Sequence, residues 1–276
     1  MHAASAIPHS THPGDTHMLV AAPPDAPPLV VLHGAMVSSA LAIREGHPLL
    51  DSFRVYAIDV IGQSVRSADV RLSMDNSEYG EWLRDVMDAL DLPAAHIHGD
   101  SWGGFVARKL AEVAPERISR LALLAPAGIG SRPLLKGLSH AAVPLMIYRT
   151  TGNRAALQRF VRSQLTTPDT TILEYFGEAL GHYNLDLRPP PLATPEPLKS
   201  CQSSTLVLAA SDDINFPGPA LLERAMQLFP QATVELLPNC KHVPPTNDPA
   251  RAKLCNRVAS FLLDKPCPAV SFDSCA

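Results

Sequence analysis

A glycine-flanked serine has the setting best suited to covalent chemistry in this chain. Ser101 lies in the pattern Gly99-x-Ser101-x-Gly103, after a strand predicted at residues 95–98 and before a helix predicted at 105–114. A serine on a sharp strand-to-helix turn has strained backbone angles. Side chains two residues away on either side would collide, which favours glycine there. The following helix directs the positive end of its dipole at the serine oxygen. The pattern predicts Ser101 as a nucleophile.

A serine hydroxyl is a poor nucleophile at neutral pH, so it needs a histidine base and an acid that orients the histidine. In turns of this type the acid, and then the histidine, follow the serine along the chain. His242 follows the last predicted strand, at residues 233–237, and we expect it to be the base. Four other histidines are not expected to be the base. His96 and His98 lie in the strand that leads to the serine, and His140 and His182 lie in a helical insertion.

The acid is expected on the loop after the strand predicted at residues 205–209, where Asp212 and Asp213 are both candidates. This acid commonly lies in the pattern Gly-x-x-Asp-x-x-x-Pro. Pro217 then selects Asp213, with Ala210 at the glycine position. Asp213 is therefore expected to orient the histidine, and Asp212 to be an exposed neighbour.

Two backbone N–H groups are needed to stabilise the negative charge that develops on an attacked carbonyl oxygen. One is expected from Trp102, directly after the serine. The other is expected from Ala35, with Met36 as second choice, in the loop after the strand predicted at residues 29–32. Met36 and the Trp102 side chain are also predicted to contact substrate, whereas His33 is expected to stabilise its loop.

Predicted strands and helices alternate along most of the chain. Strands are expected at residues 29–32, 54–60, 95–98, 118–124, 205–209 and 233–237. Helices are expected at residues 79–90, 105–114, 219–228 and 248–263, the last with Asp248 at its N-cap and Pro249 in its first turn. Strands with continuous apolar runs that alternate with helices indicate an α/β fold, with a mostly parallel sheet covered on both faces.

Residues 127–199 interrupt this alternation, and we interpret them as an inserted helical lid. Helices are expected there at 144–150, 155–164 and 172–182, before the run Arg188-Pro189-Pro190-Pro191. Candidates for the wall of a substrate pocket are Tyr148, Phe160, Tyr175, Phe176 and Tyr183. The predicted organisation is a Pro- and His-rich segment (1–28), a first core part (29–126), the lid (127–199), a second core part (200–264) and an irregular tail (265–276).

Composition argues against several partners. The net charge is -4 and Lys and Arg form no dense run, so no nucleic-acid partner is expected. The apolar stretches all fall short of the roughly 18–20 residues that a membrane helix needs, so no membrane partner is expected. Residues 1–14 lack the basic and apolar regions of a secretory signal. The sequence does not indicate an oligomeric state.

The cysteines bear on metal binding and location. They form no Cys-x-x-Cys pair, which argues against a zinc site. Free thiols are typical of a cytoplasmic protein, which is the location we expect. A local bridge in the tail, between Cys267 and Cys275, is an alternative for two of them. The five cysteines are Cys201, Cys240, Cys255, Cys267 and Cys275.

Taken together, these residues resemble the α/β-hydrolase superfamily over nearly the whole chain from Leu29 to Leu263. The matching features are Leu32-His33-Gly34, the Asp59-x-x-Gly62 turn, Gly99-x-Ser101-x-Gly103, Asp213 with Pro217, and His242. Residues 33–39 and 59–67 look like those of bacterial carboxylesterase-type members, although Ser64 stands where many relatives have glycine. The resemblance implies an α/β-hydrolase fold and hydrolysis of a small-molecule carboxylic ester through an acyl-enzyme, with no metal or organic cofactor.

The N-terminus departs from that resemblance. Relatives generally have a β-hairpin before the first parallel strand, and here about 28 Pro-rich residues precede Leu29. We therefore expect a hairpin that is shortened, or reduced to a stretch around residues 16–21.

Other activities share these features. A lactonase, a carbon–carbon bond hydrolase, a thioesterase or a perhydrolase would keep the same three side chains. A prolyl aminopeptidase would also need acidic lid residues, for which Glu174 and Glu178 are candidates. A dehalogenase or epoxide hydrolase would need aspartate in place of Ser101. An alternative of another class is a non-catalytic protein that binds a small molecule.

Overall fold

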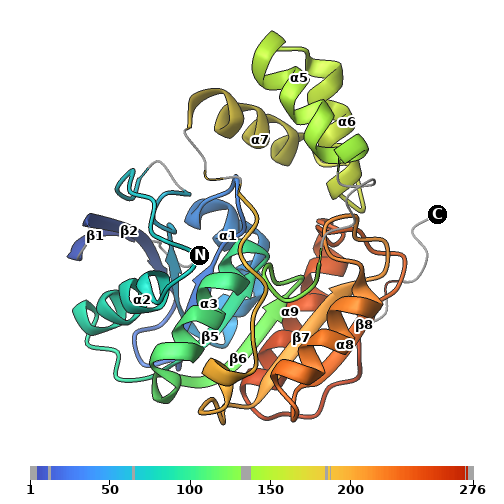
Figure 1. Cartoon of the computed structure of the whole chain (residues 1–276). Helices are drawn as coiled ribbons and strands as arrows, with labels where there is room; N and C mark the ends of the chain where they lie inside the picture. The colour runs from blue at the N-terminus through green and yellow to red at the C-terminus, as the bar shows by residue number, and fades with distance from the viewer. Residues whose placement is uncertain are drawn as a thin grey trace.

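A single sheet forms the centre of the molecule (Figure 1). The computed structural model describes residues 5–11, 14–63, 66–131, 138–183, 186, 188–270 and 272. The described strands have the order β1-β2-β4-β3-β5-β6-β7-β8. Strands β1, β2 and β4 pair antiparallel, and the remaining neighbours pair parallel, so the sheet is mostly parallel as the sequence predicted. The bounds are β1 Ser5–Thr11, β2 Gly14–Ala21, β3 Pro28–Leu32, β4 Arg54–Ile58, β5 Ala95–Asp100, β6 Ile118–Leu124, β7 Thr205–Ala210 and β8 Thr233–Leu237.

Helices cover both faces of this sheet. Side chains alternate along each strand, so in β3 Val30 and Leu32 join one buried apolar cluster while Leu29 and Val31 join the other. Helices α2, α3 and α8 pack on the first face, and α1 and α9 on the second. In the described residues no helix is both long and apolar enough to cross a membrane. The helix bounds are α1 Ser39–Glu45, α2 Glu78–Ala89, α3 Trp102–Val113, α5 Val143–Thr151, α6 Arg154–Gln164, α7 Thr170–His182, α8 Gly218–Leu228 and α9 Asp248–Leu262.

The predicted elements are all present, with differences at their ends. Helix α3 begins directly after Ser101, three residues earlier than expected, because the turn leads into the helix without a loop. The short helix α1 was not predicted. The predicted N-cap of α9 was wrong. Asn247 has the extended backbone of a cap, its side-chain oxygen accepts from the N–H of Ala250 at 3.0 Å, and Asp248 is the first helical residue.

The N-terminal hairpin is longer than the sequence suggested. Strand β1 pairs with β2 over the whole length of β1, from Ser5 opposite Val20 to Thr11 opposite Gly14. Proline counts against a central strand, but Pro8 lies in β1, at the edge of the sheet, where a missing N–H is tolerated. The alternative of a hairpin reduced to a stretch around residues 16–21 was therefore wrong.

Helices α5, α6 and α7 lie between β6 and β7 in the chain and above the sheet in space (Figure 1). We call residues 127–199 the inserted segment. Its helices have a buried apolar cluster of their own, whose members include Leu157, Phe160 and Phe176. The three helices therefore pack mainly on one another, with Leu41 of α1 at the edge of their cluster. The two ends of the segment join the first sheet face instead, through Ala127, Ile129, Ala193 and Leu198. The predicted features at Ser64 and at Cys275 lie outside the described residues.

Two glycines allow α3 to lie directly on the sheet beneath the Ser101 turn. A Cβ atom on Gly103 would lie 2.0 Å from the carbonyl oxygen of Leu32 in β3. A Cβ atom on Gly99 would lie 2.6 Å from the carbonyl oxygen of Gly103. Both obstacles are backbone atoms that cannot rotate away, so the glycines are required by close packing.

We predict that Gly103→Ala lowers the free energy of unfolding by about 3 kcal/mol or more, because α3 and β3 must separate to admit the methyl group. Gly181→Ala in α7 is the matched control, since nothing lies within 4 Å of its added Cβ atom. This control should be neutral or stabilising by about 0.5–1 kcal/mol. Urea unfolding of both variants checks the prediction, and equal stabilities would contradict it.

Candidate active site

Ser101 lies on a strained turn between β5 and α3. Its backbone angles are φ 49 and ψ -107, outside the regions that a non-glycine residue normally occupies. Backbone hydrogen bonds hold it there. The N–H of Ser101 donates to the carbonyl of Leu124 at 2.9 Å, and its carbonyl accepts from Ala127 at 2.9 Å. The turn therefore projects the Ser101 side chain beyond the carboxyl ends of the strands, at the N-terminus of α3.

Ser101, His242 and Asp213 form a continuous hydrogen-bonded chain. The Nδ1 atom of His242 lies 2.7 Å from Oδ2 of Asp213, and its Nε2 atom lies 2.9 Å from Oγ of Ser101. A carboxylate only accepts, so Nδ1 carries the proton and Nε2 is free to accept from the serine hydroxyl. The structure thus brings together the three side chains that the sequence predicted.

The Asp213 carboxylate is held from several sides. It is 4% exposed, and its Oδ1 atom accepts from the backbone N–H groups of Asn215 at 2.7 Å and Phe216 at 3.2 Å. Its Oδ2 atom is left to accept from His242. Asp212 is exposed, and its side chain accepts from Ser211 instead. The geometry thus favours Asp213 over Asp212 as the partner of the histidine.

His33 orients the loop beside the serine. Its Nε2 atom accepts from the N–H of Val60 at 2.9 Å, so its Nδ1 carries the proton and donates to the carbonyl of Gly34 at 2.7 Å. Because the peptide is planar, a fixed Gly34 carbonyl also fixes the Ala35 N–H on the opposite side. Burial lowers the pKa of His33 and keeps it neutral, although Asp59 acts in the opposite direction.

The predicted oxyanion donors lie on both sides of the serine. A Cβ atom on Gly34 would lie 3.5 Å from the Ser101 Cβ atom, so the Ala35 loop lies directly beside Ser101. Trp102 is the first residue of α3, and an N–H group in the first turn has no acceptor within its own helix. The two N–H groups predicted from the sequence therefore lie on the elements that flank Ser101.

The predicted substrate contacts have different surroundings. Met36 has a φ of 66 and packs against the apolar cluster of the inserted segment, at the side of the site. The Trp102 side chain is 4% exposed and packs against Tyr79 and Phe105, with ring centroids 6.1 and 5.5 Å apart. Met36 thus lies between the Ser101 side of the sheet and the inserted segment, whereas the Trp102 ring lies in the core. Both substrate contacts stay predictions.

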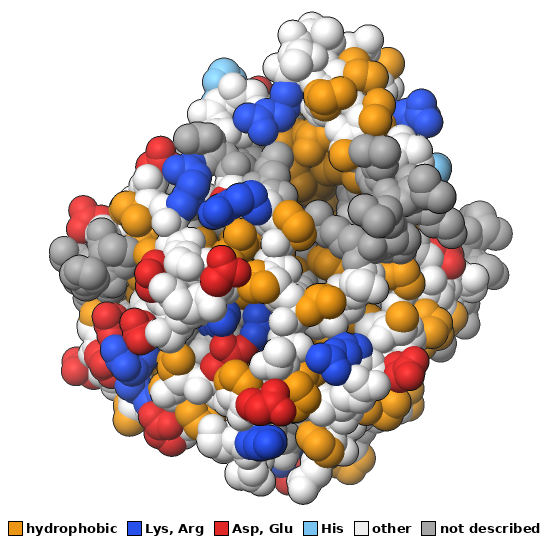
Figure 2. All heavy atoms as spheres, viewed as in Figure 1, with side chains coloured by type: hydrophobic (Ala, Val, Ile, Leu, Met, Phe, Trp, Pro, Cys, Tyr) orange, Lys and Arg blue, Asp and Glu red, His pale blue; other side chains and the backbone are white. Residues whose placement is uncertain are grey.

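A hollow opens between the inserted segment and the sheet, and hydrophobic side chains line its visible walls (Figure 2). Apolar side chains from both sides meet in this region. Met36 and Val37 come from the loop beside Ser101, and Val243 from the loop of His242. Such a hollow suits a ligand with an apolar portion.

The aromatic residues predicted for a pocket wall divide into two groups. Phe160 and Phe176 are buried with ring centroids 6.2 Å apart, so they pack inside the inserted segment. Tyr148 donates from its hydroxyl to the Gly177 carbonyl at 3.1 Å. Tyr175 donates to the Ser38 hydroxyl at 2.5 Å, which joins α7 to the loop beside the nucleophile. Tyr183 is partly buried against the same cluster.

Sequence reasoning missed the contacts between the end of α6 and the two loops that carry Asp213 and His242. Gln164 accepts from the side-chain amide of Asn215 at 2.6 Å, and the Thr166 hydroxyl bonds to residues on either side of His242. Gln and Thr are common at helix ends, so no motif marks them. Only the folded structure shows that Gln164 and Thr166 lie next to the loops of Asp213 and His242. The sequence gives no indication of this proximity.

Cys240 lies two residues before His242 without taking part in the chain of hydrogen bonds. Its side chain is buried, and burial raises the pKa of its thiol to about 11. The thiol therefore stays protonated at neutral pH and does not compete with Ser101 as a nucleophile.

Within the described residues, His, Cys, Asp and Glu side chains form no group of three or more that could hold a metal ion.

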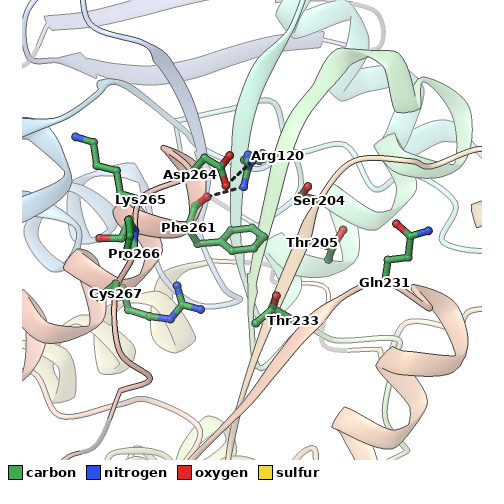
Figure 3. Close-up of a pocket in the computed structure, with 12 residues that line it drawn as sticks. Arg120, Ser204, Thr205, Gln231, Thr233, Phe261, Asp264, Lys265, Pro266 and Cys267 are labelled. Atoms are coloured by element: carbon green, nitrogen blue, oxygen red, sulfur yellow. Dashed lines mark hydrogen bonds and ion pairs between the residues drawn. The ribbon is translucent and has the colours of Figure 1, made fainter.

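A second hollow, of about 390 Å³, lies at the end of the strands opposite to Ser101, near the amino ends of β7 and β8 (Figure 3). The two arginines that line it already have partners. Arg120 pairs with Asp264 at 2.8 Å, and Arg257 pairs with Glu235 at 2.5 Å. None of the predicted site residues lines this hollow, so the site at Ser101 is the candidate for chemistry.

Comparison with known proteins points to one family. The sequence model of the family described as "alpha/beta hydrolase fold" matches residues 27–166, just over half of the chain. Carboxylesterase YbfK of Bacillus subtilis (strain 168) is 29% identical over 262 residues, which cover 92% of this chain and 86% of that protein.

Solved structures agree with this match. Naproxen esterase (carboxylesterase NP) from Bacillus subtilis superposes with a TM-score of 0.79 at 26% identity, over 94% of this chain and 91% of that one. Carboxylesterase CesB (YbfK) from the same organism gives a TM-score of 0.79 at 26% identity, over 96% and 93%. The similarity therefore extends across the sheet and the inserted segment.

We predict that His33→Ala destabilises the protein by about 2–5 kcal/mol at pH 7, because it leaves the Val60 N–H and Gly34 carbonyl without a partner. The wild-type protein should also lose stability as the pH falls below about 6.5. The folded pKa of His33 is lowered, so the unfolded chain takes up the proton first.

The variant lacks this contribution, and its unfolding free energy should fall less steeply between pH 7 and pH 5.5. Urea unfolding at both pH values, with exposed His182→Ala as control, checks this. The expected difference in slope is at most about 1.4 kcal/mol per pH unit. Parallel curves for wild type and His33→Ala would contradict the prediction.

Proposed function

Since this chain belongs to the alpha/beta hydrolase family, we propose that it is a serine carboxylesterase that cleaves small carboxylic esters through Ser101, Asp213 and His242. The observation that carries the proposal is the hydrogen-bonded chain from Asp213 through His242 to Ser101, at 2.7 and 2.9 Å. The comparisons support an ester substrate, because the similar proteins are named carboxylesterases.

In the proposed mechanism, His242 accepts the proton of the Ser101 hydroxyl as its oxygen attacks the ester carbonyl carbon. The imidazolium that forms is stabilised by Asp213, which stays ionised. His242 then gives its proton to the departing alcohol, which leaves an acyl group on Ser101. Water then loses a proton to His242 and attacks the acyl-enzyme carbonyl carbon. The bond between that carbon and Oγ of Ser101 breaks, Oγ takes the proton back from His242, and the carboxylic acid is released.

The oxyanion of each tetrahedral intermediate would be held by the backbone N–H groups of Ala35 and Trp102. The Ala35 peptide is oriented in advance by the His33 bond to the Gly34 carbonyl. The dipole of α3 adds positive potential at the same point. Donors that are already in place need no reorganisation during the reaction, and each is worth about 3–4 kcal/mol of barrier.

We assign the substrate's apolar portion to the hollow between the inserted segment and the sheet. Met36, Val37 and Val243, which are partly buried against the apolar cluster of the inserted segment, would supply apolar surface there. The inserted segment would then act as a lid domain that forms one wall of the pocket. Esters with a hydrophobic acyl or alcohol group fit this site better than charged ones, since the described wall residues offer them apolar contact.

We also infer a cytoplasmic location. Support comes from the described cysteines, Cys201, Cys240, Cys255 and Cys267, which are all free thiols. Thiols persist unpaired in a reducing compartment.

We predict that Ser101→Ala abolishes hydrolysis of p-nitrophenyl esters, tested over graded acyl lengths, while leaving the fold intact. The wild-type protein should be labelled covalently by a fluorophosphonate and the variant should not, because the probe reacts with an activated serine hydroxyl. Mass spectrometry of the labelled peptide checks the site. A folded wild-type protein that neither hydrolyses esters nor accepts the label would support a binding role instead.

The adjacent pair Asp212 and Asp213 provides a matched test of the acid. We predict that Asp213→Asn lowers kcat by about 10⁴-fold, because an amide no longer holds the imidazole in the required tautomer. Asp212→Asn should leave kcat unchanged, since its carboxylate is exposed and faces Ser211. Steady-state kinetics of both variants decide the assignment, which fails if Asp212→Asn is the inactive one.

A further inference from the structure

We propose that Thr166, at the base of the inserted segment, is a positioning residue that sets the place of His242 through the backbone on either side of it. This inference rests on the proposed function, because it gives His242 the role of base. It assigns to the inserted segment a part in catalysis besides forming a pocket wall.

The Thr166 hydroxyl bonds to both neighbours of His242. It accepts from the N–H of Lys241 at 2.9 Å and donates to the carbonyl of Val243 at 2.7 Å. The Thr166 N–H donates to the same carbonyl at 3.0 Å. One side chain thus uses its donor and an acceptor lone pair to fix the two peptide groups that flank the histidine.

The loop that carries His242 needs such a support. It leaves the sheet at the end of β8, passes through Asn239 at a φ of 52, and enters α9 only after Asn247. No strand or helix pairs its backbone between these points in the described structure, apart from an isolated parallel bridge between Leu165 and Val243. Before His242, the Cys240 carbonyl accepts from the N–H of Asp212 at 2.8 Å, and the Cys240 thiol donates to the Lys241 carbonyl at 3.3 Å. The Lys241 N–H and both backbone groups of Val243 bond to residues 164–166, directly after or at the end of α6.

The end of α6 is itself firmly held. The N–H of Val243 donates to the carbonyl of Gln164 at 2.9 Å, and Leu165 is buried in the apolar cluster of the inserted segment. Gln164 is 4% exposed, and its side-chain oxygen accepts from Asn215, two residues after the acid. Residues 164–166 therefore hold the loops of both partners of the serine at a fixed separation.

The required accuracy explains why one hydroxyl matters. His242 reaches the serine and the acid only when both ring nitrogens lie within hydrogen-bond distance, as they do at 2.9 and 2.7 Å. A displacement of about 1 Å at a reacting group can lower the rate by about 10²-fold. Loss of the Thr166 bonds leaves the Lys241 N–H without this partner and allows such a displacement.

The test compares Thr166→Val, which keeps the shape and removes the hydroxyl, with Thr166→Ser, which keeps the hydroxyl. Thr171→Val is the matched control, because Thr171 is exposed in the first turn of α7. The measurements are kcat and KM for a p-nitrophenyl ester, and the rate and final stoichiometry of fluorophosphonate labelling. Urea unfolding identifies variants that do not fold.

We expect Thr166→Val to lower kcat and the labelling rate by about 10–100-fold, with KM changed about twofold or less and full labelling at completion. Thr166→Ser should stay within about threefold of wild type, and Thr171→Val should equal it. A residue with a merely structural role would behave differently. Its loss would lower the fraction of protein that labels and leave the rate per labelled site unchanged.

The inference is overturned if folded Thr166→Val keeps the wild-type labelling rate, or if Thr166→Ser is as slow as Thr166→Val. If Thr166→Val does not fold, Thr166→Ala replaces it, and a normal labelling rate there overturns the inference in the same way. A wild-type protein that is not labelled overturns the proposed function and this inference together. A labelled wild type with an insensitive Thr166→Val overturns only the inference.

Discussion

The strained backbone of Ser101 is the constraint on which the other features of the site depend. A φ of 49 at a serine is unfavourable by about 1–3 kcal/mol, and the surrounding structure must hold it. Glycines at positions 99 and 103 let strand and helix approach closely enough to form the turn. The hydrogen bonds to Leu124 and from Ala127 then lock it. The result is a proposed nucleophile whose position is set almost entirely by backbone atoms.

A nucleophile fixed in this way cannot adjust to its partners, so the partners must be brought to it. The parallel sheet brings them together, because β5 and β7 have their carboxyl ends at the same end of the sheet, with β6 between them. The Ser101 turn and the Asp213 loop therefore leave the sheet on the same side. His242 follows β8, which pairs with β7. Residues separated by 141 positions in the chain thus meet at 2.9 Å.

The sequence predicted the parts of the site that leave a local signature. A glycine-flanked serine and a proline four residues after an aspartate are short patterns with a steric cause. The apolar runs of the strands likewise predict that they pair parallel, although they do not predict the order of the strands in the sheet. The contacts of Gln164 and Thr166 leave no such signature, because their partners lie about 50 and 75 residues away along the chain. The hairpin was underestimated for a different reason: Pro8 is acceptable only because β1 lies at an edge.

The inserted segment therefore has two regions under different constraints. Near the sheet, residues 164–166 bond to the loops of Asp213 and His242. A shift of these residues would move the His242 ring away from Ser101, whose backbone is fixed. Farther out, α5 exposes Met146 at 60% and Ile147 at 39%, so the described outer surface is not tied to the sheet. Helix α7 is an exception, since Tyr175 bonds to Ser38 in the loop beside Ser101 and the N-cap Asp169 pairs with Arg44 of α1 at 2.9 Å. Changes in the outer helices can thus reshape the hollow for another ester, provided that the base of the segment keeps the separation of the loops that carry the acid and the histidine.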